Sequence, residues 1–594
     1  MRWIQFFKDR VQNLTGAISR FPLSVLFLVI ATIALSLSIQ TEEFDYYELI
    51  IACFVGALAA AVAQMVFERF FYHKEKLRWV VLSPALLLAI IYYFTMDIES
   101  DVFSLEVVIR TTVLAFALFI AFIWIPSIRQ RLSFSDSFTA TFKALFTTIL
   151  FSIVLTIGIM SILSAINVLL FTVDYRVFAH AANIVASLFA PMFFLSDIPR
   201  YAVPGEKDTI KESFSPEVET AISVPKTMEV LLSYIIIPVT MVFTVILALY
   251  IIMNIGRDFW VDNLLEPMLV SYAIVVILVM LLIGRLENKI ASSFRLVFPK
   301  VLFFIVLLQT VASIIQISEK GLTIGRYYVI LFGLFAIVAS VIFSIWPKQK
   351  NGVVAVVLIV FSVISIIPPV DAFTVSKNGQ IAFLRSVLSD NDMLSQNTVV
   401  PKSDLPENEQ RKIVETVNDL ESNGHIEEVA FLPEEYQSSV NFEETFGFDQ
   451  HGTATEAFNY YYFEWDNNTV LDVSNYQAMS KMQIDTMSQG TNTETIQPIE
   501  IEEIVYQLEV TEEDNTVLLT LTDENGDTLI STNLTEVVSE LNQAPNATSQ
   551  DLTLDQALVE AENNEAVMDV LVTQLDFNNN GQFFIELFAL VSVK

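Results

Sequence analysis

The chain has 594 residues and a formal net charge of −34 at pH 7, and 54% of its residues are hydrophobic whereas only 17% are charged. Soluble proteins average about 25% charged residues, so the high net charge and the high apolar content must reside in different parts of this chain. The composition excludes a wholly disordered chain, a nucleic-acid-binding protein that relies on basic charge, and a single soluble globule.

The charge changes sharply at Asp371. Residues 371–594 contain 42 acidic and 7 basic side chains, a net charge of −35, whereas residues 1–370 carry a net charge of +1. The chain therefore divides into a nearly neutral, apolar part and a polar, acidic domain. Its one cysteine, Cys53, excludes an intramolecular disulfide and a cysteine-based zinc or iron–sulfur site.

Eleven segments of the apolar part are predicted to be membrane-spanning helices, because a helix needs about 20 apolar residues to cross about 30 Å of hydrocarbon. The predicted spans are 22–40, 47–68, 79–95, 104–125, 144–170, 177–195, 229–254, 267–284, 299–317, 327–346 and 351–369. The first is not a cleaved signal peptide, because it is long, lacks a small-residue cleavage pattern and precedes ten more spans.

Basic residues in the connecting segments are sorted to one side of these spans. Six segments on that side, beginning with the N-terminus, hold 21 Lys and Arg residues. The opposite segments hold only Arg176, Arg257, Lys320 and Arg326. The positive-inside rule therefore predicts a cytoplasmic N-terminus over 1–21, a helical bundle over 22–370 and, after eleven crossings, an extracytoplasmic domain over 371–594.

The acidic domain is predicted to be α+β, built as one lobe or as two lobes that meet near 440–500. Helices are expected over 376–388, 406–423, 533–543 and 553–563. Strands are expected over 458–465, 501–510, 516–521 and 528–531, with a last pair flanking 578–581. The Asn-Gly sequence at 525–526 is a typical hairpin turn.

The strand Phe458–Trp465 is aromatic at nearly every position, which leaves two interpretations open. Aromatic strands more often fill a hydrophobic core. The alternative is a platform on which sugars stack, or a contact with a membrane or a partner.

Asp576, Asn578 and Asn580, followed by a glycine, resemble the opening of a calcium loop, which has oxygen ligands at positions one, three and five. Position twelve should be an acid but is a leucine, and the nearest acid is Glu586. Apolar residues on both sides fit a hairpin turn at least as well. The hairpin turn is the favoured interpretation, and these four residues are only a weak candidate for a calcium site; we expect no other metal and no cofactor.

Polar side chains inside the predicted spans concentrate in their outward halves. Glu106 and Arg110 lie four residues apart, so they share a helix face and can form an ion pair. The predicted intramembrane polar cluster consists of Glu106, Arg110, Asn167, His180, Asn183, Gln309 and Gln316. It is either an outward-facing crevice for a polar or amphiphilic ligand or ordinary hydrogen bonding between helices, with Arg110 reaching the interface.

Motifs of catalysis are missing from the sequence. It contains no Gly-rich phosphate loop, nucleophile elbow, His-Glu-x-x-His or metal-ligand spacing. The longest predicted cytoplasmic segment, Ser196–Met228, is too short for an ATPase or kinase domain. We therefore expect neither an enzyme nor a primary active transporter.

Four segments resemble a bacterial membrane family known only as domain of unknown function 4153. They are Phe193–Pro199, Val224–Val230, Ile317–Tyr327 and Pro369–Ser376, the last followed by Gln380 and Leu384. The resemblance covers roughly residues 190–390 and implies a bacterial envelope protein, but the family has no activity to transfer.

The most specific of these matches contains Glu319, Gly321, Arg326 and Tyr327. Gly321 permits a tight outer turn, and Glu319 and Arg326 can pair at the membrane surface. A structural corner between two helices is the alternative interpretation.

Together these observations predict a multi-pass plasma-membrane protein that presents an acidic outer domain in envelope assembly or signalling. The alternative is a secondary transporter or flippase-like permease that uses the polar cluster. The expected partners are the lipid bilayer and, at the outer domain, divalent cations or cationic envelope components, with no nucleic acid.

Overall fold

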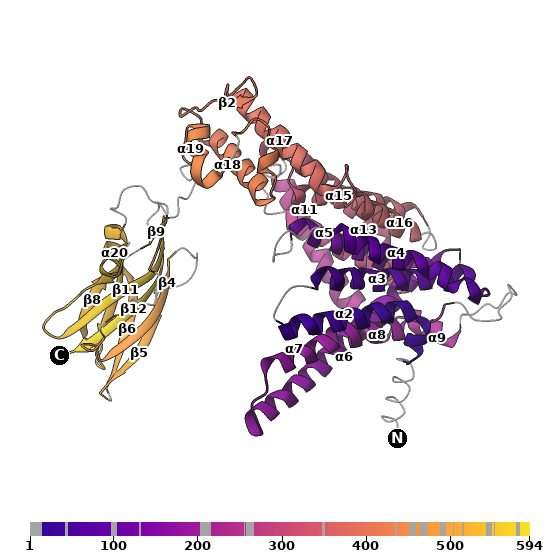
Figure 1. Ribbon diagram of the computed structural model, residues 1–594, viewed down its shortest axis with the longest axis horizontal. Helices are drawn as coiled ribbons and strands as arrows, with labels where there is room; N and C mark the ends of the chain where they lie inside the picture. The colour runs from indigo at the N-terminus through magenta and orange to yellow at the C-terminus, as the bar shows by residue number, and fades with distance from the viewer. Residues whose placement is uncertain are drawn as a thin grey trace. The chain divides into compact units, whose positions relative to one another are not determined.

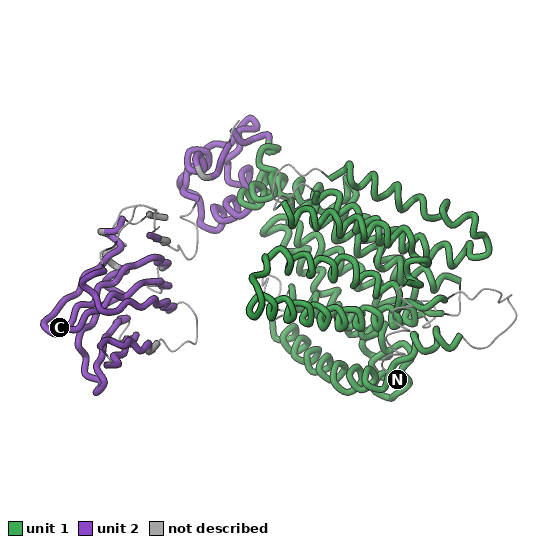
Figure 2. Tube along the Cα trace, turned by 60° about the horizontal axis from the view of Figure 1, so that its bottom comes forward, with its two compact units in different colours: residues 1–386, 416–429 green, residues 387–415, 430–594 purple. Residues whose placement is uncertain are grey.

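The chain forms two compact units, residues 1–386 with 416–429 and residues 387–415 with 430–594 (Figure 2). The computed structural model describes residues 15–41, 46–96, 104–129, 132–201, 215–254, 256, 266–346, 351–433, 436–450, 459–463, 471, 473–486, 495–502, 504–513, 516–541, 549–551, 553–577 and 583–594. The first unit extends beyond the predicted bundle boundary at 370, because the helix after the bundle packs against it.

The first unit is helical (Figure 1). Its first half contains α2 (Pro22–Thr41), α3 (Tyr47–Val66), η1 (Phe67–Phe71), η2 (Glu75–Leu77), α4 (Arg78–Thr95), α5 (Leu105–Trp124), η3 (Ile125–Ser127), α6 (Phe134–Leu169), α7 (Tyr175–Asn183), η4 (Ile184–Phe189) and α8 (Ala190–Asp197). Its second half contains α9 (Pro216–Ile222), α10 (Lys226–Val230), η5 (Leu231–Ile236), α11 (Ile237–Asn254), α12 (Glu266–Leu282), α13 (Lys289–Ile315), α14 (Ile317–Lys320), α15 (Ile324–Ile345), α16 (Gly352–Ile364) and α17 (Ala372–Asp390).

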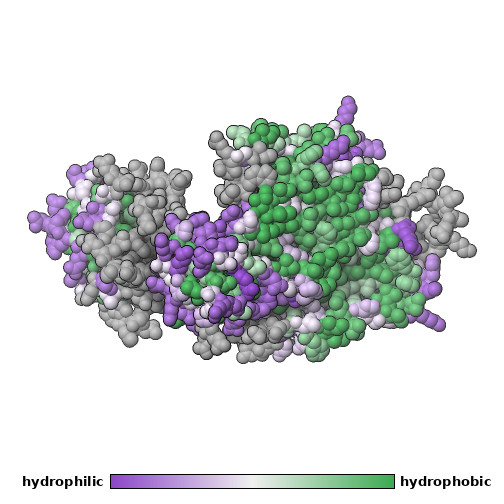
Figure 3. All heavy atoms as spheres, turned by 90° about the horizontal axis from the view of Figure 1, so that it is seen from above, coloured by the Kyte–Doolittle hydropathy of each residue, from purple (hydrophilic) through white to green (hydrophobic). Residues whose placement is uncertain are grey.

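Nine helical segments among the described residues are long and apolar enough to cross a membrane. The two remaining predicted spans coincide with shorter apolar helices, α12 with 17 residues and α16 with 13. The visible face of the bundle is hydrophobic across its middle (Figure 3). These helices support the prediction of a polytopic helical membrane protein. The predicted count of eleven spans is reached only if the shorter helices α12 and α16 also cross the membrane.

The longest helix, α6, has 36 residues and begins with a capping box. The backbone N–H of Asp136 donates to Ser133 Oγ at 3.2 Å, and that of Ser133 donates to Asp136 Oδ2 at 3.0 Å. Reciprocal bonds of this kind satisfy donors that a helix N-terminus otherwise leaves open. The first turns of α6 are buried in the bundle, whereas its last turns expose apolar side chains such as Leu169.

The second unit combines helices with a β-rich part. Its helices and short strands are β1 (Leu394–Ser395), β2 (Thr398–Val399), α18 (Glu407–Ser422, of which 416–422 belong to the first unit), α19 (Ser438–Phe446), α20 (Leu534–Leu541) and α21 (Leu554–Ala557). The longer β-rich part contains β3 (Asn459–Tyr462), β4 (Ala478–Asp485), β5 (Thr495–Ile501), β6 (Ile504–Glu513), β7 (Thr516–Thr522), β8 (Thr528–Asn533), β9 (Ser549–Asp551), β10 (Leu558–Val559), β11 (Ala566–Phe577) and β12 (Phe583–Val593).

Two sheets enclose the core of this β-rich part. One has six strands in the order β4-β12-β11-β3-β9, with β10 paired to β11, and the other has the order β5-β6-β7-β8. Leu508 and Leu519 from the second sheet and Leu571 and Leu587 from the first belong to one buried cluster. Since both inner faces contribute to one core, the sheets pack as a sandwich.

Several predicted elements of the acidic domain are confirmed. The Asn-Gly turn joins β7 to β8, with Gly526 in the left-handed region at φ 83°. The predicted last strand pair is β11 and β12. The two predicted helices after the bundle are α17 and α18, and Gly424, at φ 73°, comes shortly after the second of them.

The helix predicted over 553–563 is wrong beyond Ala557. The chain continues as β10, whose Leu558 and Val559 pair with Leu571 and Val570 of β11. Pairing with a formed sheet overrides the weak helical preference of this short apolar run.

The aromatic segment forms β3, which lies between β11 and β9. Phe463, directly after β3, is buried in the core between the sheets. This placement favours the core-filling interpretation over an exposed sugar-binding platform. Phe458, Glu464 and Trp465 lie outside the described residues.

Candidate functional site

Charged side chains of the bundle form two clusters, one at each end. We call the first the arginine cluster, which consists of Arg20, Gln64, Glu68, Arg78 and Arg200. We call the second the stem junction, because the chain leaves the bundle there. It consists of Arg110, Gly321, Arg326, Tyr327, Asp371 and Gln380.

The centre of the arginine cluster is a buried ion pair between Arg20 and Glu68. Arg20 Nε donates to Glu68 Oε1 and Arg20 Nη2 to Oε2, both at 2.8 Å, and the two side chains are 7% and 12% exposed. A guanidinium bound in this bidentate manner is a strong, directional partner for a carboxylate. Arg20 also donates to the backbone carbonyls of Ile198, at 2.5 Å, and Pro199, at 3.1 Å. One side chain therefore ties the segment before α2 to the end of α3 and the exit of α8.

Arg78, at the start of α4, extends this network. Its Nε donates to Gln64 Oε1 at 3.2 Å, and Gln64 Nε2 donates to Glu68 Oε1 at 3.0 Å. Its Nη2 donates to the carbonyls of Ser19 at 2.9 Å and Arg20 at 2.7 Å. The four polar side chains fix α4 against α2 and α3.

Other basic connecting segments lie at the same end of the bundle. Arg69 donates to the carbonyls of Ile128, at 2.7 Å, and Arg129, at 2.9 Å, which joins the segment after α3 to the segment after α5. Arg285, after α12, donates to Asp136 at the start of α6 at 2.5 Å. Five of the six basic segments predicted to lie on one side therefore meet at one end, and Lys348 and Lys350 of the sixth lie outside the described residues.

At the stem junction, Asp371 lies directly before α17 and is fully buried. Its Oδ1 accepts from the backbone N–H of Phe373 at 3.1 Å and of Thr374 at 3.2 Å, so it caps the helix. Arg110 Nη2 lies 3.3 Å from the same oxygen and 2.7 Å from Glu106 Oε1. The i,i+4 pair predicted on α5 therefore forms and also reaches the start of α17.

Burial acts to raise the pKa of Asp371, but hydrogen bonds from Thr374 and Phe373 and the charge of Arg110 outweigh it and hold this pKa below its ordinary value. Asp371 is therefore an anion at neutral pH.

The turn between α14 and α15 holds α17 from the other side. Gly321 has φ 70°, a conformation that favours glycine, and a Cβ atom there would lie 2.6 Å from Gln380 Oε1 of α17, so the Gln380 side chain would have to shift. Ser376 Oγ of α17 donates to the carbonyl of Leu322 at 2.9 Å. The motif that contains Glu319, Gly321, Arg326 and Tyr327 thus forms the turn against which α17 packs where it leaves the bundle.

Two further motif residues fix this turn. Arg326 Nη1 donates to the carbonyl of Gly321 at 2.7 Å, and the Tyr327 hydroxyl donates to the carbonyl of Val370 at 2.7 Å. Glu319 lies on the short helix α14, just before the glycine.

The other members of the predicted polar cluster lie in separate helix interfaces. Asn183 Nδ2 donates to the carbonyl of Thr32 at 3.0 Å and to Ser36 Oγ at 2.9 Å, which joins α7 to α2. His180 is half-buried one turn earlier on α7. Asn167, near the end of α6, is exposed and accepts from the N–H of Val173 at 2.7 Å.

Gln309 on α13 and Gln316, directly after it, are buried, 4% and 6% exposed. Between them Ser313 donates to Glu266 Oε1 of α12 at 2.5 Å. Of the seven predicted residues, Arg110 belongs to the stem junction and Glu106 pairs with it, whereas Asn183 and Gln309 lie in other helix interfaces.

The two clusters are centred on residues that were not predicted as site residues, namely Arg20 and Glu68 at one end and Asp371 at the other. Arg20 and Glu68 are 48 residues apart, and Arg110 and Asp371 are 261 residues apart. Neither separation is a spacing at which two side chains meet on one helix, so the sequence does not predict either ion pair. The single signal for Asp371 is its place in the family-like segment Pro369–Ser376.

The calcium interpretation gains no support from the ends of its loop. Asn578 and Asn580 lie outside the described residues. Glu586 forms an ion pair with Lys481 at 2.8 Å and faces Gln574 in the register of β11 and β12. Burial raises the pKa of Asp576, next to the end of β11. No group of three or more acidic, His or Cys side chains among the described residues could hold a metal ion.

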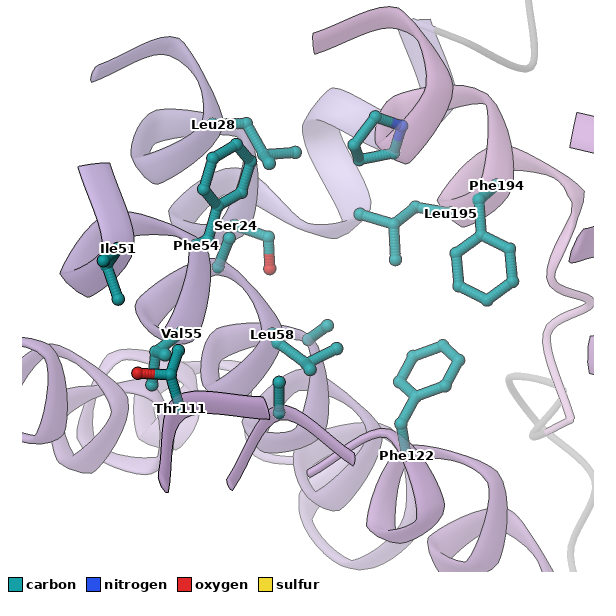
Figure 4. Close-up of a pocket in the computed structure, with 14 residues that line it drawn as sticks. Ser24, Leu28, Ile51, Phe54, Val55, Leu58, Thr111, Phe122, Phe194 and Leu195 are labelled. Carbon is teal, nitrogen blue, oxygen red and sulfur yellow. The ribbon is translucent and has the colours of Figure 1, made fainter. Parts of the chain in front are cut away.

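Within the bundle, α2, α3, α5 and α8 line a partly open apolar cavity of about 370 Å³ (Figure 4). Phe54, Leu58, Phe122 and Phe194 are among the residues that line it. Ser24 contributes a buried hydroxyl that has no hydrogen-bond partner among the described residues. The cavity suits an apolar or amphiphilic molecule.

Comparison with known proteins yields one match. The family model described as Domain of unknown function (DUF4153) matches residues 27–399. No curated protein and no solved structure matches the chain. The match begins within the first apolar span, Pro22–Thr41, and includes the other eight spans found among the described residues, the stem junction and all of α17.

Replacing Glu68 with alanine should destabilise the full-length protein by about 3–5 kcal/mol, because it leaves Arg20 buried without its carboxylate. Thermal unfolding in detergent measures this effect. Glu75→Ala removes an exposed carboxylate nearby and should change stability by less than about 0.5 kcal/mol. Equal effects of the two substitutions would contradict a stabilising role of the pair.

Replacing Asp371 with asparagine should destabilise the protein by about 1–3 kcal/mol at pH 7, because the anion holds both Arg110 and the start of α17. A lowered pKa means that this contribution is present above about pH 4 and is lost as the pH falls through the pKa of the folded protein. Unfolding of both proteins between pH 3 and 7 should therefore show a difference that shrinks only at the acidic end. A difference that appears only at low pH would contradict the assignment.

Proposed function

Because this chain belongs to the DUF4153 family, whose description assigns no activity, we propose a function from its own residues. It is a bacterial plasma-membrane protein that crosses the bilayer eleven times and presents its acidic domain outside the cell. There it serves envelope assembly or signalling. It acts by holding and positioning this domain, not as an enzyme.

The observation that carries the proposal is the fixed start of α17. The ion pair of Asp371 with Arg110 joins the first turn of α17 to α5. Ser376 and Gln380 of α17 contact the turn at Gly321. A flexible tether would serve a domain that only needs an anchor. A helix that is capped, ion-paired and packed at its base fixes where the chain leaves the bundle toward the acidic domain.

The charge distribution supports the orientation. The arginine cluster and the other basic segments belong inside by the positive-inside rule, and the domain of charge −35 belongs outside. An acidic outer domain attracts divalent cations and cationic envelope components and is repelled by anionic surfaces.

A second function, a secondary transporter or flippase-like permease, is favoured by the apolar cavity between α2, α3, α5 and α8. An amphiphile that enters this cavity could bond to the buried Ser24 hydroxyl. The dispersed positions of Asn183, Gln309 and Gln316 count against a polar pathway through the outer half of the bundle.

A truncated chain separates the two functions. A protein that ends at Val429 keeps every residue of the first unit, including α17, but lacks residues 430–594 of the acidic domain. Under the leading proposal it should fail to restore resistance to envelope-damaging agents in a deletion strain, whereas the full-length chain restores it. Immunoblots of membrane fractions check that both chains are present at equal levels. Full restoration by the truncated chain would contradict presentation and favour the permease.

A further inference from the structure

We propose that the arginine cluster binds the phosphate group of an anionic ligand, of which a phospholipid of the adjoining leaflet is the source that its surroundings favour. The site is a polar cavity of about 320 Å³ at the basic end of the bundle. Arg20, Gln64, Glu68, Arg78, Trp79 and Arg200 contribute to its walls. This inference does not depend on the proposed function.

The hydrogen bonds of the cluster leave donors open on two arginines. Arg20 donates hydrogen bonds to Glu68 and to the backbone carbonyls of Ile198 and Pro199. Arg78 uses Nε and Nη2, and its Nη1 has no partner among the described residues. Arg200 has no hydrogen bond or ion pair to any described residue. Phosphate oxygens suit such guanidinium groups, because one group can donate two bonds to them.

The charges around the cavity also favour an anion. Three arginines face two carboxylates, Glu68 and Glu75. Glu68 is held in its ion pair with Arg20, and Glu75 is exposed. One positive charge therefore remains unbalanced in the cavity, and a bound phosphate compensates it.

The guanidinium of Arg78 is already oriented for binding. The carbonyls of Ser19 and Arg20 and the amide of Gln64 hold two of its three nitrogens. A ligand therefore need not immobilise this side chain, which lowers the entropic cost of binding.

The surroundings of the cavity resemble the interface of a bilayer. Trp79, next to Arg78, is 63% exposed, and tryptophan side chains collect at the level of lipid headgroups. From there α4 exposes a continuous apolar face that includes Val80, Leu87 and Phe94. Acyl chains can lie along this face while a headgroup phosphate enters the cavity, as basic pockets between helices bind anionic lipids in other membrane proteins.

Native mass spectrometry of the full-length protein in detergent tests the proposal, with phosphatidylglycerol, phosphatidylcholine and inorganic phosphate as probes. Phosphatidylglycerol should bind more tightly than phosphatidylcholine. Arg200→Gln should weaken its binding about ten-fold, the effect of losing one charged hydrogen bond. Arg200→Lys should retain most of the binding, because it keeps the charge.

Lys289→Gln is the matched control, because it removes one exposed positive charge at the N-terminus of α13, outside the cavity. It should change binding less than two-fold. Equal binding by the wild type and Arg200→Gln, with unchanged thermal stability, would overturn the proposal. Binding of inorganic phosphate that depends on Arg200, without preference among lipids, would support the phosphate site and assign it to a soluble ligand.

Discussion

Hydrocarbon tolerates a charged side chain only where a partner compensates its charge, and the helical bundle is arranged around this constraint. Its ion pairs Arg20–Glu68 and Arg110–Asp371 lie at opposite ends. Arg20 and Glu68 join three segments at the basic end, and Arg110 and Asp371 join α5 to α17 at the stem junction. Between these ends the helices pack through apolar side chains and through hydrogen bonds such as those of Asn183 to α2 and of Ser313 to Glu266. The end pairs add contacts between segments that are distant in the chain.

The stem junction and the arginine cluster differ in what they bind. The stem junction fixes a helix that leads toward the acidic domain, and its parts come from α5, from the turn at Gly321 and from the residues around Asp371. The arginine cluster lies among the basic segments and keeps donors open on Arg78 and Arg200. One end is therefore suited to holding a domain, and the other to contact with anionic groups of the membrane surface.

The features that the sequence predicts correctly are those whose determining interaction is local or compositional. The apolar runs, the sorting of basic residues, the i,i+4 pair of Glu106 and Arg110 and the Asn-Gly hairpin all depend on neighbours in the chain. The sequence does not predict partners that are distant in the chain. Nothing in the sequence spacing links Arg110 to Asp371, which is 261 residues away. Leu558 and Val559 were predicted to be helical because the strand that pairs with them, β11, comes later in the chain.

The orientation of the two ends is the central claim, and thiol labelling tests it most directly. The single cysteine, Cys53, is buried, so in a Cys53→Ala background an introduced cysteine is the only thiol of the protein. Asn525→Cys lies in the exposed hairpin turn of the acidic domain, and Lys74→Cys lies at the basic end. A membrane-impermeant maleimide should label Asn525→Cys on intact cells and Lys74→Cys only after permeabilisation. The reverse pattern, or labelling of both on intact cells, would contradict the account.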